Sequence, residues 1–183
     1  SPFKSKALQW KQDRKNYKEL WTQTVQSQTK PIIWFHCASL GEFEQARPII
    51  EKYGCENRQN AIILTFFSPS GYEVRKNYDS ADFITYLPLD TKQNAREFLD
   101  LIKPDVALFA KYEFWYHYLN GLKERNIPVI LFSAVFRREQ LFFRSYGTLF
   151  REILGKFSKI FVQNEESKQL LASIGISSEA APD

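Results

Sequence analysis

Residues 32–43 read Ile-Ile-Trp-Phe-His-Cys-Ala-Ser-Leu-Gly-Glu-Phe, and this stretch decides the fold class. Its first half is a short apolar run typical of a buried strand, and its second half is a turn of small residues that leads into a helix. In an open parallel sheet, ligands bind outside the carboxyl ends of the strands, and a turn containing serine and glycine lets a ligand approach the backbone closely. We therefore expect Glu42, at the helix start, to face a ligand-binding crevice.

The same pattern of a strand followed by a helix repeats along the chain. Short apolar runs that we expect to be strands occupy residues 32–36, 61–66, 83–86, 106–110, 129–133 and 160–163. Helix caps are expected at Ser68 with Pro69, at Asp90 and at Asn164, opening helices over residues 69–78, 91–102 and 165–173. Such repeated units with right-handed crossovers predict an α/β fold: a Rossmann-like sheet of about six parallel strands with helices on both faces.

Composition and charge narrow the class of protein. The chain has 183 residues, of which 44% are hydrophobic and 25% charged, as expected for one globular domain. Its net charge of +4 favours an anionic partner, such as a phosphorylated lipid or a membrane surface. No apolar run approaches the roughly 18 residues that span a bilayer, and no secretory signal is visible.

The sequence does not indicate a metal or nucleotide site. Cys37 and Cys55 lack metal-ligand spacing and are typical of reduced cytosolic thiols, and neither His36 nor His117 has a second ligand at useful spacing. No glycine-rich dinucleotide fingerprint follows the first apolar run, and the P-loop motif is absent. We therefore expect no metal and no cofactor in this chain, and we expect His36 to make a structural hydrogen bond.

Five short segments carry a resemblance to one enzyme family. Residues 36–43, quoted above, resemble the H-A-x-S-x-G-E-F signature of the Kdo (3-deoxy-D-manno-octulosonic acid) transferases. Further segments resemble family motifs in the same order: residues 65–73 (TFFSPSGYE), 86–90 (YLPLD), 111–115 (KYEFW) and 162–166 (VQNEE). Two positions depart from the family pattern. Lys111 stands where the family usually has glutamate. Residues 133–135 read Ser-Ala-Val where the family usually has Asn-Ala-Arg, so the contact with an anion that the family arginine implies is not assigned to this chain.

The resemblance implies a two-domain GT-B glycosyltransferase of lipopolysaccharide biosynthesis. Residues 31–183 would form its N-terminal, acceptor-binding domain, and the C-terminal domain that binds the donor would be absent. Residues 1–30 would be an amphipathic helical lead-in that follows a missing membrane anchor. The implied reaction transfers Kdo from CMP-Kdo to the lipid A precursor, at the cytoplasmic face of the inner membrane. We expect this chain alone to be inactive, because the half that binds the donor is missing.

Glu42 is the candidate catalytic residue, because the glutamate of the family signature is the proposed general base. A carboxylate within hydrogen-bond reach of the acceptor hydroxyl can remove its proton as the glycosidic bond forms. The structural alternative is a glutamate that stabilises its helix through the macrodipole, by roughly 0.3–1 kcal/mol. Ser39 and Gly41 could offer backbone N–H groups to an acceptor phosphate or to the donor carboxylate, or could only form the turn.

Glu113 and Lys111 are further candidates for binding the acceptor, at the end of the predicted strand 106–110. Glu113 could be a second acid or could orient the site; its structural alternative is a salt bridge with Lys111 or a nearby arginine. Lys111 reverses the charge usual in the family, so we expect it to pair with a carboxylate or to contact an acceptor phosphate.

The most basic aromatic stretch lies between residues 136 and 151. Arg137 and Arg138, with Arg144 and Arg151, are interleaved with phenylalanines and a tyrosine. We favour binding of anionic lipid, because arginine and aromatic side chains together suit a membrane interface. A solvated helix face is the structural alternative, and a groove for single-stranded nucleic acid uses the same residue types. We expect no nucleic-acid partner. Comparing the binding of anionic lipid vesicles with the binding of oligonucleotides at equal salt distinguishes the lipid and nucleic-acid interpretations.

Two alternatives to the Kdo transferase interpretation stay open from the sequence. The first is a GT-B glycosyltransferase with another lipid or sugar acceptor. The second is a non-catalytic α/β module that binds anionic lipid or nucleic acid through the basic aromatic stretch.

Overall fold

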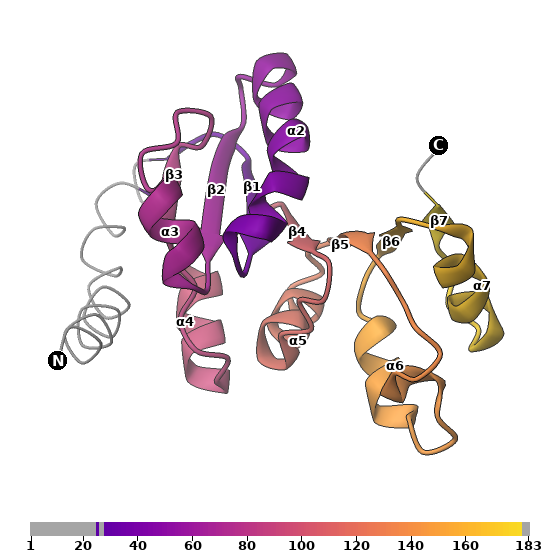
Figure 1. Ribbon diagram of the computed structural model, residues 1–183. Helices are drawn as coiled ribbons and strands as arrows, with labels where there is room; N and C mark the ends of the chain where they lie inside the picture. Colours follow the sequence, from indigo (N-terminus) through magenta and orange to yellow (C-terminus); the bar gives the residue numbers. More distant parts are fainter. Residues whose placement is uncertain (1–24, 26–27, 181–183) are drawn as a thin grey trace, which may run out of the picture.

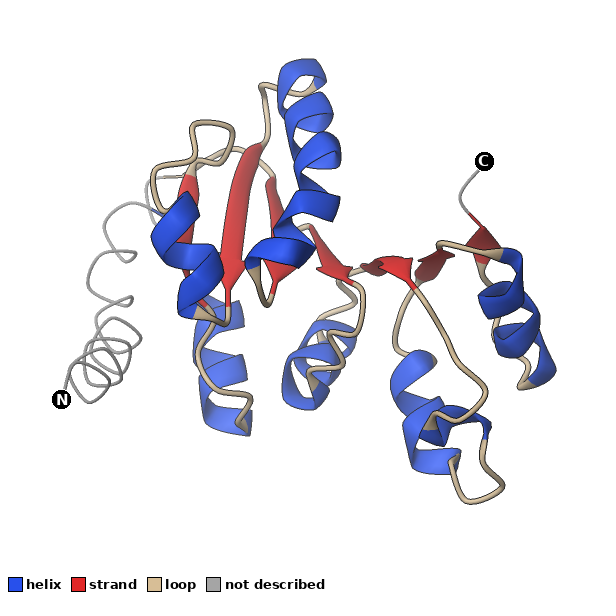
Figure 2. Cartoon of the chain, viewed as in Figure 1, coloured by secondary structure: helices blue, strands red, loops and turns tan. Residues whose placement is uncertain are grey.

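The computed structural model describes residue 25 and residues 28–180, which form one parallel sheet with helices on both faces (Figures 1 and 2). The strands are β1 (Ile32–Cys37), β2 (Ala61–Phe66), β3 (Phe83–Tyr86), β4 (Val106–Ala110), β5 (Val129–Ala134), β6 (Lys159–Val162) and β7 (Glu179–Ala180). The helices are α2 (Leu40–Glu56), α3 (Pro69–Arg75), α4 (Lys92–Ile102), α5 (Tyr116–Glu124), η1 (Leu141–Phe143), α6 (Thr148–Leu154) and α7 (Glu165–Ser173). The expected α/β class and the doubly covered parallel sheet are confirmed.

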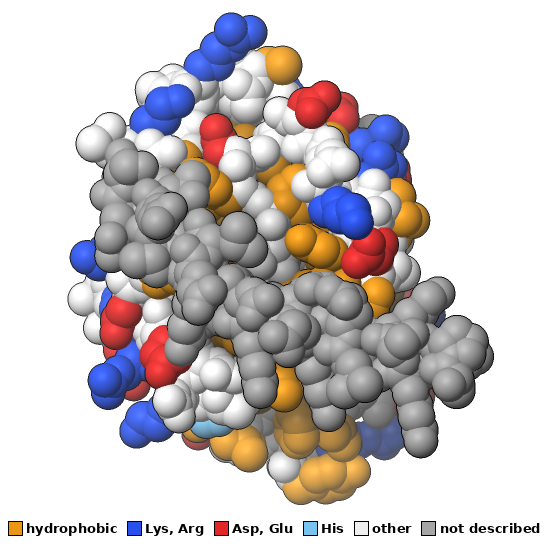
Figure 3. Space-filling model, turned by 90° about the vertical axis from the view of Figure 1, so that its left-hand side faces the viewer, with side chains coloured by type: hydrophobic (Ala, Val, Ile, Leu, Met, Phe, Trp, Pro, Cys, Tyr) orange, Lys and Arg blue, Asp and Glu red, His pale blue; other side chains and the backbone are white. Residues whose placement is uncertain are grey.

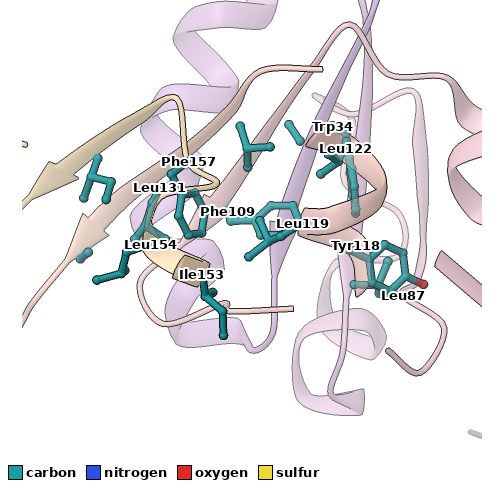
Figure 4. Packing of buried hydrophobic residues seen from close by; sticks show 14 of the residues in the cluster. Trp34, Leu87, Phe109, Tyr118, Leu119, Leu122, Leu131, Ile153, Leu154 and Phe157 are labelled. Carbon is teal, nitrogen blue, oxygen red and sulfur yellow. The ribbon is translucent and has the colours of Figure 1, made fainter. Parts of the chain in front are cut away.

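Two hydrophobic layers hold the sheet between its helices. All six residues of β1 and of β2 are buried, because α2 and α3 cover one face and α4 and α5 the other. Alternate residues of β1 point to opposite faces, so that Trp34 joins the larger layer and Phe35 the smaller. Trp34 packs against Phe109, Tyr118 and neighbouring side chains of the larger layer (Figure 4). These layers fix where each strand ends, and hence where the site forms.

The order of the strands creates a topological switch point at the carboxyl ends of β1 and β4, and the region outside these two strand ends is called the crevice below. In the order β3-β2-β1-β4-β5-β6-β7, the chain winds outward from β1 to β3 and then returns to place β4 on the other side of β1. Connections that leave β1 and β4 therefore diverge to opposite faces. Ligands of open α/β sheets bind at such a topological switch point. Glu42 follows β1 and Glu113 follows β4, so both candidate carboxylates belong to this point.

Three local predictions need correction. The sheet has seven strands where the sequence predicts about six, because residues 179–180 form β7 and pair with β6. The helix that begins at Pro69 ends at Arg75 rather than at residue 78. Asp90 does not cap α4: the Thr91 hydroxyl accepts from the Asn94 N–H, at 3.2 Å.

Asp90 instead caps a helix that is distant in sequence. Its carboxylate accepts from the backbone N–H groups of His117 and Tyr118 at the start of α5, at 3.0 and 3.3 Å. The expected cap at Asn164 is confirmed, because its side chain accepts from the Ser167 N–H at 2.8 Å. Such caps satisfy N–H groups that have no partner within the helix, and they fix the direction of each helix start.

The lead-in expected over residues 1–30 falls mainly on residues outside the described part of the chain. Val25, which is described, is helical and packs into the larger hydrophobic layer. Within the described residues, no helix has the length and apolar character needed to cross a membrane.

Candidate active site

Glu42 lies at the third position of α2, directly beyond the carboxyl end of β1. Ser39 is the N-cap residue, but its hydroxyl makes no capping bond. The Glu42 side chain turns back instead, and its carboxylate accepts from the backbone N–H groups of Ala38 and Ser39. A glutamate at this position commonly bonds back to the cap in this way. The arrangement fixes the Glu42 carboxylate above the end of β1, half-buried in the crevice.

Opposing effects set the pKa of Glu42. Burial raises it most, and the nearby charge of Glu113 raises it further. The N–H groups of Ala38 and Ser39 and the charge of Lys111 lower it, but the net result is a pKa raised from 4.5 to about 7. A carboxyl group that titrates near neutral pH is suited to accept a proton from an alcohol during catalysis. Burial therefore dominates over the helix dipole, a balance that the sequence leaves open.

Glu113 enters the crevice from the loop between β4 and α5 and is only 8% exposed. One of its oxygens, Oε2, lies 3.2 Å from Nε2 of His36, and the same oxygen accepts from the indole N–H of Trp115. The salt bridge that we considered with Lys111 or an arginine is wrong: the partner of Glu113 is His36 on β1, which is fully buried. The expectation of a structural hydrogen bond for His36 is confirmed.

Left-handed backbone occurs at the carboxyl ends of two neighbouring strands. Lys111, after β4, has φ 56°, and Ser133, near the end of β5, has φ 54°. The register of β5 against β6 shifts between Leu131 and Ala134, around Ser133. Non-glycine residues rarely adopt this conformation, and those that do cluster at functional sites. The Lys111 ammonium has no carboxylate within ion-pair distance among the described residues, but its charge acts on Glu42.

Ser39 and Gly41 lie at the helix start beside Glu42, as expected. The Ser39 N–H that we considered for an external anion already donates to Glu42. Gly41 is exposed, and a Cβ added at this position would meet no atom within 4 Å. Because its φ is not positive either, neither packing nor backbone geometry requires glycine there.

Arg137 and Arg138 follow β5 and are exposed on the same edge of the sheet, but no contact joins them to the two carboxylates. Arg151 has a structural role, because its guanidinium donates to the carbonyls of Phe142 and Arg144. The basic aromatic stretch is thus not one solvated helix face: it forms a loop, η1 and α6.

An apolar cavity of about 450 Å³ lies between the loop after β4 and the segment that contains η1 and α6. It is lined by Tyr112, Phe114, Glu139, Gln140, Leu141, Phe142, Phe150 and Ile153. Tyr112 and Phe114 flank Glu113 in sequence, and Glu113 itself is not among the lining residues. Figure 3 shows hydrophobic side chains gathered with lysine or arginine at the lower end of the molecule, the end where Figure 1 places α6 and the preceding loop.

Comparison with known proteins assigns the family. The sequence model of the 3-deoxy-D-manno-octulosonic-acid transferase (kdotransferase) family matches residues 9–182. The chain belongs to this family. The match spans nearly the whole chain, so it includes both carboxylates, the lysine between β4 and α5, and the residues that line the cavity.

Two relatives illustrate the sequence similarity to the Kdo transferases. A 3-deoxy-D-manno-octulosonic acid transferase of Aquifex aeolicus is 31% identical over 148 residues, which cover 80% of this chain and 38% of that protein. A bifunctional glycosyltransferase/methyltransferase of Fusobacterium nucleatum is 28% identical over 147 residues, which cover 78% of this chain and 23% of that protein. The chain therefore spans well under half the length of these relatives.

Solved structures of sugar-nucleotide epimerases share the fold. UDP-N-acetylglucosamine 2-epimerase from Rickettsia bellii has a TM-score of 0.60 at 15% identity, over 82% of this chain and 44% of that chain. The enzyme from Neisseria meningitidis, bound to UDP-GlcNAc, has a TM-score of 0.58 at 19% identity, over 83% and 46%. The Rossmann-like sheet expected for one half of a GT-B enzyme is thus confirmed as a fold.

Sequence reasoning assigns no role to Thr65 or to the indole of Trp115. Thr65 lies opposite His36 in the register of β1 with β2, and its hydroxyl oxygen is 2.8 Å from Nδ1 of His36. A signal is present: His36 and Thr65 are each the fifth residue of an otherwise apolar strand. In this member of the Kdo transferase family, Glu113 contacts His36, and His36 in turn contacts Thr65 in the buried core.

Proposed function

We propose that this chain is the acceptor-binding part of a glycosyltransferase that transfers Kdo from CMP-Kdo to the lipid A precursor, with Glu42 as the general base. The observation that supports it most is the pair of carboxylates, Glu42 and Glu113, at the switch point of the sheet in a member of the Kdo transferase family. We also propose that the acceptor-binding domain begins at residue 31. The enzyme would act at the cytoplasmic face of the inner membrane.

The chemistry follows from the protonation of Glu42. The acceptor hydroxyl must lose its proton as its oxygen bonds to the anomeric carbon of the donor sugar. A carboxylate whose pKa is about 7 holds that proton far better than an ordinary glutamate, yet it is still ionised in about half of the molecules at neutral pH. We assign proton removal to Glu42 and orientation of the acceptor to Glu113, whose own oxygen is held by His36 and Trp115.

Three features support binding of a phosphorylated, acylated acceptor. Lys111 brings a positive charge to the crevice. Gly41 leaves the helix start open to close approach, with Ser39 beside it. The apolar cavity, near the exposed Arg137 and Arg138, suits an acyl chain joined to an anionic headgroup. We propose that the same surface lies against the membrane.

The direct test uses the full-length enzyme that contains this chain. Incubation with CMP-Kdo and the lipid A precursor should give a product heavier by one or more Kdo units, detected by mass spectrometry. Transfer to a different lipid or sugar acceptor alone would favour another glycosyltransferase. Binding of oligonucleotides as tight as binding of anionic vesicles at equal salt, with no transfer, would favour the non-catalytic module.

We expect Lys111→Glu to weaken binding of the lipid A precursor about tenfold, because a charge-assisted contact to phosphate contributes roughly 1.5 kcal/mol. The variant should also raise the pKa of Glu42, since Lys111 now lowers it. Lys123→Glu, which makes the same charge change at an exposed position late in α5, is the matched control. Equal acceptor affinity for both variants at low salt would leave Lys111 without a phosphate contact.

A second prediction concerns the apolar cavity. Leu141 lines it and is 43% exposed, so Leu141→Gln should fold normally yet weaken acceptor binding roughly fivefold, or by about 1 kcal/mol of lost apolar burial. Leu149, 58% exposed on α6 and not part of the lining, supplies the control Leu149→Gln. Equal loss in both variants, measured by titration with detergent-dispersed precursor, would point to adsorption on the surface rather than to occupancy of the cavity.

A further inference from the structure

A groove between α4 and α5 is lined by basic and polar side chains to which the proposed reaction assigns no role. Lys92 and Arg96 line it one turn apart on α4, and His117 and Asn120 line it on neighbouring turns of α5. Asp90, two residues before Lys92, accepts from the backbone N–H of His117 at 3.0 Å, so the starts of the two helices lie side by side. These four side chains therefore come from the first turns of two adjacent helices.

Close packing of α4 against α5 gives the groove its floor. Ala95 on α4 and Gly121 on α5 both line the groove and are buried. A Cβ added at Gly121 would lie 2.7 Å from Cδ1 of Leu99, so a larger residue there would push the helices apart. The volume of the groove is about 290 Å³, near the lower end of the range for small-molecule sites. The groove thus has room for one small polar group.

The basic side chains of α4 are available to an anionic ligand. Among the described residues, no carboxylate lies within ion-pair distance of Lys92, and Arg96 reaches only Asp100, at 3.9 Å. The imidazole of His117 and the side-chain amide of Asn120 add N–H donors from the opposite helix. Cationic side chains together with N–H donors suit the oxygens of a phosphate group.

The carboxylates near the groove are engaged or lie at its other end. Glu124, the one carboxylate among the lining residues, belongs to the last turn of α5. Its neighbour Arg125 is already held by Asp100, to which it donates at 2.6 Å. Asp90 does not line the groove, and its carboxylate accepts from the N–H groups at the start of α5. An anion is therefore favoured at the end formed by Lys92, Arg96, His117 and Asn120.

The surroundings of the groove favour a membrane lipid as the source of the phosphate. Tyr116 lines the groove and is 42% exposed, and the ammonium of Lys156 lies 5.8 Å from the centre of its ring. Tyrosine and basic side chains are typical of the membrane interface. Helices α4, α5 and α6 pack on the same hydrophobic layer, so the groove and the apolar cavity lie on the same side of the sheet (Figure 1).

We propose that the α4–α5 groove binds the phosphate of an anionic phospholipid headgroup and thereby holds the enzyme on the membrane surface. Lys92 and Arg96 supply the charge, and His117 and Asn120 supply hydrogen bonds. The inference rests on the proposed function in one respect, the contact with a membrane. Among the described residues, no hydrogen bond or ion pair joins the groove to Glu42, so the headgroup site is separate from the candidate active site.

The first test measures binding of the full-length enzyme to sedimented phosphatidylcholine vesicles with and without phosphatidylglycerol. Each cation near an anionic surface contributes roughly fivefold, so Lys92→Gln with Arg96→Gln should weaken binding to the anionic vesicles about 30-fold. Lys52→Gln with Arg58→Gln removes two exposed cations from α2 and the loop after it, on the other side of the sheet, and should have little effect. Equal losses in both double variants would show that net charge alone sets binding, which would overturn the proposal.

An isosteric change inside the groove gives a second test. Asn120→Asp adds a carboxylate without changing the cations and should weaken binding to phosphatidylglycerol vesicles roughly fivefold. Asn77→Asp makes the same change at an exposed position between α3 and β3 and is the matched control. A loss in the control as large as in Asn120→Asp would contradict a site in the groove.

Soluble glycerol 3-phosphate distinguishes the two sources of phosphate. It should not displace the enzyme from phosphatidylglycerol vesicles at millimolar concentration; displacement would show that the groove takes a free phosphate, and the lipid assignment would be wrong. These assays measure no transfer. Absence of Kdo transfer with binding that depends on the groove would overturn the proposed function alone. Transfer with equal vesicle binding by groove and control variants would overturn this inference alone.

Discussion

Glu42→Gln in the full-length enzyme is expected to lower kcat by roughly 10²–10⁴-fold while leaving acceptor affinity nearly unchanged. Glutamine keeps the shape of the side chain and an oxygen that can accept from the Ala38 and Ser39 N–H groups, but it cannot take a proton from the acceptor hydroxyl. Turnover and acceptor binding should be measured for the same preparation. Activity within a few-fold of the unsubstituted enzyme would show that Glu42 is a helix-start residue only.

The stability of the same variant supplies an internal control. The folded-state pKa of Glu42, about 7, lies above its ordinary value of 4.5, so folding favours the neutral carboxyl. Its contribution to stability is fully present below pH 4.5 and is lost as the pH rises through 7. The glutamine side chain of the variant does not titrate. The thermal midpoint of the variant, relative to the unsubstituted chain, should therefore rise between about pH 4.5 and 8; a constant difference would contradict the raised pKa.

Glu113→Gln is expected to lower kcat by roughly 10²-fold, because an amide, which is neutral and has only one acceptor oxygen, cannot replace the buried carboxyl group that orients the acceptor. It should also lower the pKa of Glu42, since the charge of Glu113 now raises it. The two effects separate by pH: the loss of turnover persists at about pH 8, whereas the change in the acid limb is seen below about 7.

Glu124→Gln is the matched control for this prediction, because Glu124 is exposed at the end of α5 and its exchange removes the same charge without touching the crevice. Its kcat and its acid limb should both be unchanged. If Glu113→Gln behaves like this control in turnover but loses thermal stability, Glu113 only satisfies the hydrogen bonds of His36 and Trp115.

Much of the fold is predictable from the sequence because fully buried strands leave a strong signal. β1 and β2 are six-residue runs of almost wholly apolar residues, and their ends are predictable within one residue. β7 is two residues, Glu179 and Ala180, and leaves no such signal. Capping rules are local and assign Asp90 to the adjacent α4, but its partners at the start of α5 are 27 and 28 residues away.

The positions of the two carboxylates can be predicted from the sequence, but their hydrogen-bond partners and the pKa of Glu42 cannot. Motif and position place Glu42 and Glu113 at strand ends, which the sheet order brings to one crevice. The partner of Glu113 depends on strand register and on the path of the loop after β4, and neither can be inferred from one sequence. The same holds for the pKa of Glu42, because the balance of burial against N–H donors is a property of the folded chain.

The most direct test of the central claim is the pH dependence of kcat/KM for the full-length enzyme with CMP-Kdo and lipid A precursor. This parameter reports the ionisation of groups in the free enzyme. If Glu42 removes the acceptor proton, the profile falls on the acid side with a midpoint of about 7. The midpoint should move to lower pH in Glu113→Gln. A flat profile across about pH 5–8, or a midpoint near 4.5 that Glu113→Gln leaves unchanged, would contradict Glu42 as the buried general base.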